Sequence, residues 1–193
     1  MTAVTLDATR VPPRRTAAVA VVATAGCGAL AIRPVLLAGP LRPNTVLVAL
    51  FATLLAVGAL LPVGRRDSPA PLRTVAAVCV LGVLAFGAGR ILSGGHAPVG
   101  LTAWTVAANS LAAIAEELWF RKVCYGLLAR ANPVLAIAGS SVLFAAVHVS
   151  IYGVAVLPID VAAGAVLGWQ RWASGSCTAP AITHVLANLF VVL

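Results

Sequence analysis

Charged side chains are scarce in this sequence. Asp, Glu, Lys and Arg make up 9% of the 193 residues, whereas 61% of the residues are hydrophobic. Soluble domains are about 25% charged, so this composition excludes an ordinary water-soluble domain. An intrinsically disordered chain is excluded as well, because disorder needs low hydrophobicity and high charge. With a mean hydropathy of +1.04, we expect one domain whose solvent is lipid.

Acidic residues are especially few. The chain has 5 Asp and Glu against 13 Lys and Arg, a formal net charge of +8. In a soluble protein this excess would suggest a nucleic-acid partner. Here the arginines stand singly or in pairs between apolar runs, which is the distribution that sets membrane topology. We therefore expect membrane lipid, and no nucleic acid, as a partner.

Cysteine pairs at metal-binding spacing are also missing, since the 4 cysteines include no Cys-x-x-Cys. We expect them to serve as small buried hydrophobic residues rather than as disulfides or zinc ligands. These residues are Cys27, Cys79, Cys124 and Cys177.

Long apolar runs dominate what is present. After a polar tail, residues 1–15, seven runs follow that can each cross about 30 Å of hydrocarbon as a helix of about 20 residues. The expected fold class is therefore all-α, a polytopic transmembrane helical bundle of about seven spans. The runs are Thr16–Leu37, Asn44–Val63, Leu72–Leu92, Trp104–Ala129, Pro133–Ser150, Val154–Trp169 and Cys177–Leu193.

The basic residues support this count. If the N-terminal tail is cytoplasmic, ten of the 13 basic residues fall in cytoplasmic segments and three fall outside, as the positive-inside rule requires. We therefore expect a multi-pass protein of the cell membrane with a cytoplasmic N-terminus. The ten are Arg10, Arg14, Arg15, Arg65, Arg66, Arg73, Arg121, Lys122, Arg130 and Arg171, and the three are Arg33, Arg42 and Arg90.

Two adjacent carboxylates, Glu116 and Glu117, lie inside the fourth run. Such groups are costly in a membrane unless they face a partner or a water-filled cavity. Glu117 precedes Arg121 by four residues, the favourable order for an ion pair within a helix. Glu116 then remains without a sequence-local partner. The pattern fits either an intramembrane functional site or a charge cluster at the cytoplasmic helix end.

Two further polar positions interrupt the fifth and seventh runs. His148 follows Phe144 by four residues, and Asn188 follows His184 by four residues, so each pair shares a helix face. Structural roles in packing or interhelical hydrogen bonding are possible for each alone. Together with Glu116 they could form a site between helices that hydrolyses peptide bonds.

The depths of the two histidines do not match in straight helices. At 1.5 Å per residue, His184 lies about 10 Å and His148 about 22 Å from the cytoplasmic start of its run. Either the fifth helix begins later than Pro133, or the spans tilt, or Pro180 breaks the last helix. Of these, we expect a late start of the fifth helix together with tilt.

The motifs Glu116–Arg121, Phe144–His148 and His184–Asn188, in that order in a multispanning chain, resemble the CPBP intramembrane protease family, also called the CAAX protease and bacteriocin-processing (Abi) family. The glycines Gly164 and Gly168 fit the same pattern. The resemblance covers residues 104–193. It divides the chain into a cytoplasmic tail (1–15), accessory transmembrane helices (16–100) and a catalytic core (101–193).

The resemblance implies a role for each motif residue. Glu116 would activate the attacking water, and His148 would assist at the water or metal position. His184 and Asn188 would stabilise the tetrahedral oxyanion. The implied supporting residues are Glu117 and Arg121. The implied cofactor is either none or a divalent metal, zinc, held by Glu116, His148 and His184.

Asp160 departs from the family pattern, and we expect it either to face the cavity or to pair with Arg171.

The resulting expectation is an intramembrane endopeptidase with a water-filled cavity open toward the cytoplasm. Its substrate would be a membrane-associated or prenylated, CAAX-type protein or peptide. One alternative is a catalytically silent membrane protein of the same fold that gives bacteriocin immunity or acts as a scaffold. A small transporter is the other, although no internal repeat supports it.

Overall fold

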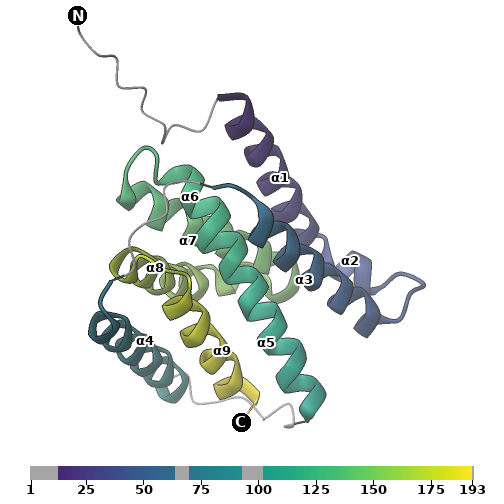
Figure 1. Ribbon diagram of the computed structural model, residues 1–193. Coiled ribbons are helices and arrows are strands. Elements are labelled where there is room, and N and C mark those ends of the chain that lie inside the picture. The colour runs from purple at the N-terminus through teal and green to yellow at the C-terminus, as the bar shows by residue number, and fades with distance from the viewer. Residues whose placement is uncertain (1–12, 64–69, 93–101, 193) are drawn as a thin grey trace, which may run out of the picture.

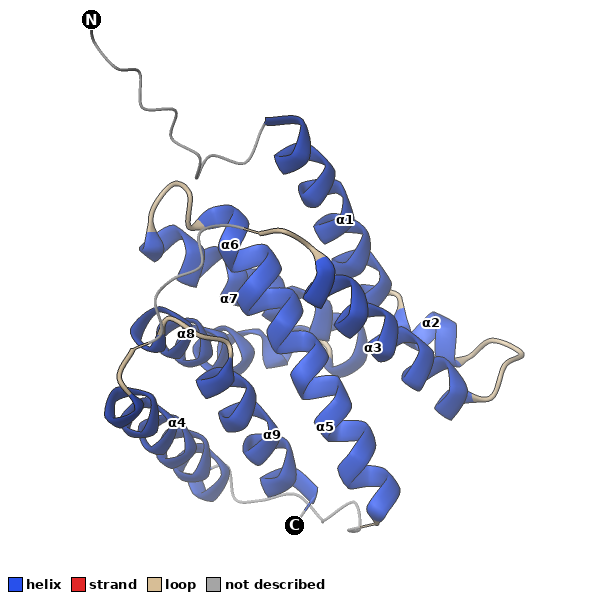
Figure 2. Cartoon of the chain, viewed as in Figure 1, coloured by secondary structure: helices blue, strands red, loops and turns tan. Residues whose placement is uncertain are grey.

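The structure is a computed structural model that describes residues 13–63, 70–92 and 102–192. All regular elements in these ranges are helical (Figures 1 and 2). They are α1 (Pro13–Ala31), α2 (Arg33–Leu37), α3 (Pro43–Leu60), α4 (Leu72–Leu92), α5 (Ala103–Glu117), the π-helix η1 (Leu118–Cys124), α6 (Tyr125–Leu128), α7 (Pro133–Tyr152), the 3-10 helix η2 (Val154–Val156), α8 (Leu157–Ser174) and α9 (Thr178–Val192).

Apart from the first, each apolar run of the sequence corresponds to one helical stretch of the structure. The run Leu72–Leu92 coincides with α4 at both ends. The sixth run begins as η2 and continues as α8 to Ser174, five residues beyond the expected end. Gly175, with φ of 64°, ends α8 in the left-handed conformation that glycine adopts most easily.

The first run is broken near its end, where a single helix was expected. Ile32 separates α1 from α2 with φ of −90° and ψ of 8°. Pro34 explains the break, because proline has no N–H to donate and its ring clashes with the carbonyl four residues earlier. Arg33 therefore opens a separate short helix.

The fourth run forms one long helical stretch, α5–η1–α6, whose middle is π-helical (Figure 1). This wider segment starts at Leu118, directly after the two glutamates. π-helical turns are rare and occur frequently at functional sites. Here the turn contains Arg121, so it sets the direction of the arginine relative to Glu117.

α7 and α8 pack closely because of the two glycines of the sixth run. A Cβ on Gly164 would lie 2.8 Å from Cα of Ser141, and one on Gly168 would lie 3.2 Å from Cγ2 of Ile137. Small residues four apart allow helix backbones to approach within a membrane. This face of α8 is thereby fixed against the face of α7 that leads to His148.

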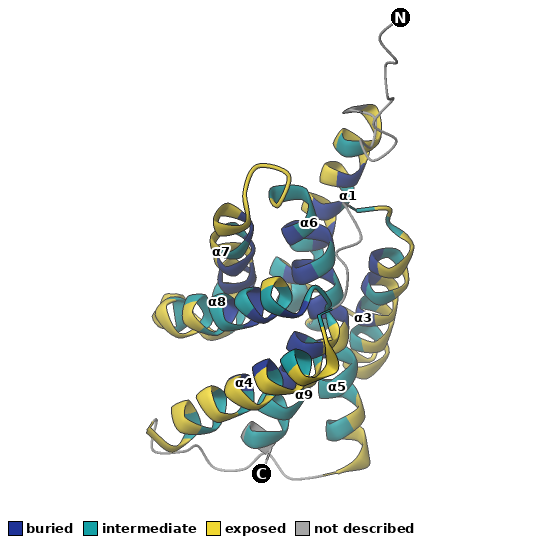
Figure 3. Ribbon diagram, turned by 60° about the vertical axis from the view of Figure 1, so that its left-hand side comes forward, coloured by how far each residue is buried: buried dark blue, intermediate teal, exposed yellow. Residues whose placement is uncertain are grey.

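The buried core is shared between the N-terminal helices and the later ones. Phe51 of α3 and Leu30 of α1 belong to the same cluster as Trp119 and Phe120 of η1. Figure 3 shows the buried positions where these helices meet, with exposed positions along their outer sides. Many exposed side chains are large and apolar, such as Leu84 of α4 at 62% exposure. That surface suits contact with lipid.

Three of the described helices, α3, α4 and α7, are long and apolar enough to cross a membrane. The count of seven spans is not confirmed, because only these three of the described helices meet both the length and the composition. Among the polar residues grouped from the sequence, Glu116 lies on α5, His148 on α7, and His184 and Asn188 on α9. The division into accessory helices and catalytic core also stays a prediction.

Basic side chains bind main-chain oxygens where helices end. Lys122 donates from Nζ to the carbonyls of Gly58 and Ala59 at the end of α3, at 2.7 and 2.6 Å. Arg90 donates to the carbonyl of Phe190 near the end of α9, at 3.0 Å. A cation at a helix C-terminus is favourable, because the last carbonyls carry partial negative charge.

Candidate active site

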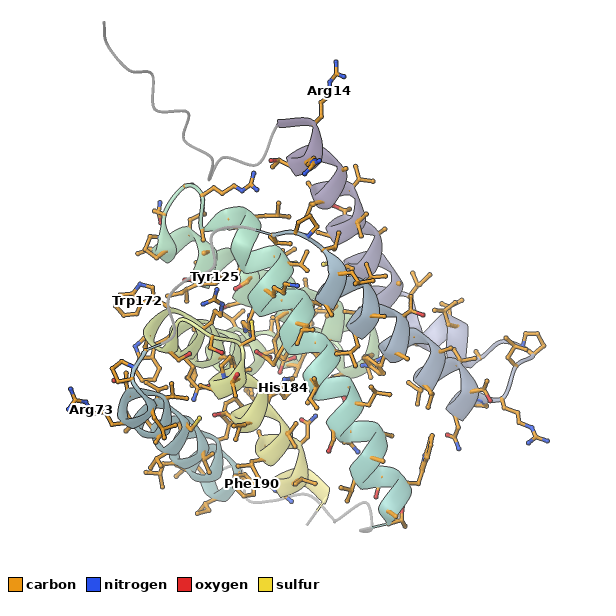
Figure 4. The ribbon with its side chains drawn as sticks, viewed as in Figure 1. Arg14, Arg73, Tyr125, Trp172, His184 and Phe190 are labelled. Atoms are coloured by element: carbon orange, nitrogen blue, oxygen red, sulfur yellow. The ribbon has the colours of Figure 1, made fainter. Side chains whose placement is uncertain are left out.

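Glu116 lies at the centre of a buried polar cluster formed by α5, α7 and α9. Its Oε2 lies 4.0 Å from Nε2 of His148 and 3.9 Å from Nε2 of His184. All three side chains are at most 12% exposed. The structure thus brings together the three residues that the sequence motifs grouped, while their catalytic roles stay predictions. His184 lies near the middle of the bundle, between Arg14 at one end and Phe190 toward the other (Figure 4).

The other oxygen of Glu116 is occupied by a residue that sequence analysis did not place in the site. Oε1 lies 3.6 Å from Nη1 of Arg33, whose side chain is 13% exposed. The Arg33 guanidinium also lies over the ring of Phe51, 5.5 Å from its centroid. From the sequence, Arg33 is interpreted as a topology signal. Its other role becomes visible only in the structure, where the helix breaks at Ile32. Glu116 therefore presents one oxygen to a cation and the other to two imidazoles.

Glu117 has two partners rather than the single one expected. Its Oε2 lies 3.3 Å from Nε of Arg121, which confirms the predicted ion pair, and both side chains are fully buried. Its Oε1 lies 3.0 Å from Nδ1 of His184. A carboxylate can only accept, so the His184 Nδ1 carries the proton of this hydrogen bond. Glu117 therefore orients His184 as well as neutralising Arg121.

His148 is held from two sides. Its Nδ1 lies 2.8 Å from the carbonyl oxygen of Phe144 and 3.6 Å from Oδ2 of Asp160. For Asp160 we considered a place in the cavity and a pair with Arg171. The structure places Asp160 in the cluster, beside His148. Arg171 instead donates from Nε to the carbonyl of Arg121 at 3.1 Å.

Phe144, one helical turn before His148, contacts both imidazoles. Its ring centroid lies 4.6 Å from that of His148 and 5.7 Å from that of His184. The guanidinium of Arg121 lies over the same ring at 5.3 Å, a cation–π contact. Phe144 thus contacts both imidazoles and the guanidinium of the buried ion pair.

Asn188 is the one motif residue that the cluster does not include. It is half-buried on α9, one turn beyond His184. Its side chain makes no hydrogen bond to any described residue of the chain. Its assigned part in oxyanion binding therefore stays a prediction.

The zinc site implied at Glu116, His148 and His184 stays a prediction. No group of three or more His, Cys, Asp or Glu side chains within 13–63, 70–92 and 102–192 is placed to hold a metal. The Glu116-to-histidine distances of 3.9 and 4.0 Å exceed the roughly 3.3 Å between two ligands of a tetrahedral zinc bound at about 2.0 Å.

An apolar groove of about 440 Å³ runs along α9 beside the cluster. Leu118 and Val185, sequence neighbours of Glu117 and His184, contribute to its walls. The imidazoles and Glu116 do not line it. The water-filled cavity expected at the cytoplasmic side thus stays a prediction. The groove is lined by Ile114, Leu118, Cys177, Thr178, Ala181, Ile182, Val185 and Leu186.

Comparison with known families identifies the segment that carries this cluster. The model of the family described as type II CAAX prenyl endopeptidase Rce1-like matches residues 98–190. Over this segment the chain is similar to the Rce1-like family. No curated protein and no solved structure matches the chain.

The match confirms the resemblance drawn from the three motifs, all of which lie within it. Together with three apolar helices long enough to cross a bilayer, the similarity to the Rce1-like family indicates an integral membrane protein. Arg33 lies 65 positions before the matched segment begins. The helices outside the family match therefore supply a direct neighbour of Glu116.

Proposed function

We propose that this protein is an intramembrane endopeptidase that cleaves a prenylated, CAAX-type peptide or another membrane-associated peptide. One observation carries the proposal. A single carboxylate oxygen, Oε2 of Glu116, faces the Nε2 atoms of His148 and His184 at 4.0 and 3.9 Å. These gaps are too long for direct hydrogen bonds but suit a bridging water.

The proposed reaction starts at that water. Glu116 takes one proton, and the resulting hydroxide attacks the carbonyl carbon of the scissile peptide bond. Negative charge then builds on the carbonyl oxygen, where Asn188 and the Nε2–H of a protonated His184 act as hydrogen-bond donors. Glu116 passes its proton to Nε2 of His148, and the C–N bond breaks as the leaving amine accepts that proton from His148. Atoms and charges balance without a metal, and the ligand geometry described above favours this metal-independent version.

The surroundings suit a lipid-modified substrate. The groove along α9 is apolar and adjoins the helix that carries His184. We expect the isoprenoid chain of a substrate to stay in an apolar environment while the peptide reaches Glu116. We place the substrate on the cytoplasmic side, because the topology assigned to the basic residues puts the end of α6 there.

A cleavage assay tests the proposal. The purified protein in liposomes is given an internally quenched, S-farnesylated peptide ending in a CAAX sequence, and the same peptide without the farnesyl group. We expect cleavage of the farnesylated peptide that Glu116→Gln abolishes at normal protein levels. Ser110→Ala, on the same helix α5, is the matched control and should keep the wild-type rate.

The outcomes separate the candidate functions. Folded wild-type protein that leaves both peptides intact would overturn the proposed substrate. Membrane proteomics of cells with wild type or Glu116→Ala then decides between another substrate, which leaves an uncleaved precursor, and the catalytically silent scaffold, which leaves none.

A further inference from the structure

The two histidines of the cluster have matching surroundings. Each has Glu116 near Nε2 and a second carboxylate near Nδ1. For His184 that carboxylate is Glu117, at 3.0 Å. For His148 it is Asp160, at 3.6 Å, contributed by a different helix. Glu117 belongs to the first motif, whereas Asp160 lies in none of the three.

Asp160 is held in place by the packing of α8 on α7. It lies in the first turn of α8, and Gly164 follows one turn later on the same face. Gly164 allows the backbone of α8 to approach Ser141 of α7. Ser141 lies two turns before His148 on α7, so this contact brings the start of α8 toward the imidazole.

Among the described residues, no polar partner of the Asp160 carboxylate other than His148 is found. Its Oδ2 is buried without a hydrogen bond to the described residues, and the side chain is 16% exposed. Leaving an ionised oxygen buried and unsatisfied is costly. The imidazole of His148 is the group at hand that can compensate this cost.

We propose that Asp160 is the positioning residue of His148, as Glu117 is for His184. This inference rests on the proposed endopeptidase function. Nδ1 of His148 faces two acceptors, Asp160 and the Phe144 carbonyl, so it carries a hydrogen and Nε2 points at Glu116. Asp160 also stabilises the positive charge that His148 carries between taking a proton from Glu116 and giving it to the leaving amine. In serine proteases an aspartate acts on a histidine in the same two ways.

Kinetics of three variants test the role. Asp160→Asn keeps the shape but removes the charge, and we expect kcat to fall about 10- to 100-fold with little change in KM, as for other residues that orient a reacting histidine. Asp160→Glu should restore part of kcat. Ile159→Asn is the matched control, because it adds the same amide at an exposed neighbouring position and should leave kcat unchanged.

A measurement independent of activity accompanies the kinetics. The chain has only 3 histidines, so the ring nitrogens of ¹⁵N-histidine-labelled protein in micelles can be assigned with His148→Gln and His96→Gln. We expect Asp160→Asn to shift the His148 signals and to leave those of His184 in place.

The two readouts fail in different ways. Unchanged His148 signals together with an unchanged kcat in Asp160→Asn would overturn the inference. Loss of stability with no shift at His148 would assign Asp160 a structural role only and would also overturn it. If wild-type protein cleaves no peptide, the proposed function fails while the NMR result still decides the pairing.

Arg33 carries a second inference from a separate observation. Its guanidinium lies 3.6 Å from Oε1 of Glu116 and over the Phe51 ring. We infer that Arg33 positions the Glu116 carboxylate, holding Oε1 so that Oε2 faces the two histidines. The accessory helices would then be part of the active site rather than a separate support.

Substitutions at position 33 test this second inference. We expect Arg33→Gln to lower kcat at least 10-fold with KM little changed. The kcat of Arg33→Lys should lie between those of wild type and Arg33→Gln, because lysine keeps the charge but loses the planar group that lies over Phe51. Arg42→Gln, at an exposed position, is the control. A wild-type kcat in folded Arg33→Gln would overturn the inference. If Arg33→Gln does not fold, Arg33→Lys decides instead. The inference then fails if Arg33→Lys has a wild-type kcat and its Glu116 carboxylate infrared band is unchanged from wild type.

Discussion

Glu117 and His184, 67 positions apart in the sequence, meet through Oε1 and Nδ1 at 3.0 Å. The second oxygen of Glu117 lies 3.3 Å from Nε of Arg121. One carboxylate therefore joins the first motif to the third and neutralises a buried cation. A supporting residue in this position affects both the stability of the bundle and the orientation of an imidazole.

Substitution of Arg121 and Glu117 should separate these two effects. Arg121→Ala leaves Glu117 charged and buried without its cation, and breaking such a pair costs about 3–5 kcal/mol. We expect a marked loss of thermal stability and of membrane protein yield. Glu117→Gln should destabilise less, but should lower kcat about 10- to 100-fold by releasing His184. Thermal unfolding in detergent and the peptide assay measure the two effects.

The double variant provides the control for this prediction. Glu117→Gln combined with Arg121→Ala removes both charges, so it should unfold at a higher temperature than Arg121→Ala alone. Normal stability with lost activity in Arg121→Ala would instead assign Arg121 to the chemistry.

The helices themselves could be predicted well from hydrophobicity and chain breakers. The bounds of α4 coincide with an apolar run, and α7 begins at Pro133 as the sequence indicates. The expectation that the fifth helix starts later, drawn from unequal histidine depths, is therefore wrong. The two histidines reach the same Glu116 oxygen despite those depths, so the angles between helices absorb the difference. Helix angles depend on side-chain packing and cannot be read from runs of apolar residues.

The site could be predicted only in part for a similar reason. The three motif residues Glu116, His148 and His184 stand out because each is polar in an apolar run. Arg33 and Asp160 are equally polar, but the position of Arg33 suggests a topology signal, and that of Asp160 leaves open both the cavity and a pair with Arg171. Their contacts arise from the break at Ile32 and the close packing at Gly164. No periodicity reveals the π-helical segment that follows Glu117.

The orientation of the chain can be tested with reporter fusions. We expect fusions after Arg66 and after Arg130 to report the cytoplasm, and one after Arg42 to report the outside. In the structure Arg130 donates a hydrogen bond to the Thr16 hydroxyl, so the segment after α6 and the start of α1 lie at the same end. Opposite reports from Arg130 and an N-terminal fusion would contradict both the span count and this contact.

Metal removal should leave the activity intact. The distances from Glu116 to the two histidines exceed the ligand spacing of zinc, and the proposed reaction balances without a metal. We expect unchanged cleavage of the farnesylated peptide after dialysis against a chelator, and no stoichiometric metal by mass spectrometry of the purified protein. A loss of activity that zinc restores, together with bound zinc in the untreated protein, would establish the metal-dependent mechanism instead.

The packing of α1 against η1 can be tested through two cysteines. Sγ of Cys27 lies 3.9 Å from Sγ of Cys124, although the residues are 97 positions apart. A short, membrane-permeant bifunctional thiol reagent should therefore link them in a variant that carries Cys79→Ser and Cys177→Ser. With a protease site inserted between residues 64 and 69, the two fragments should stay joined on a denaturing gel. Because α1 directly precedes Arg33, this link would place the accessory helix beside the catalytic segment. A variant that keeps only Cys27 and Cys177 is the control, and its two fragments should separate. Separation of the fragments in the protein that keeps Cys27 and Cys124 would contradict the packing that brings Arg33 to Glu116.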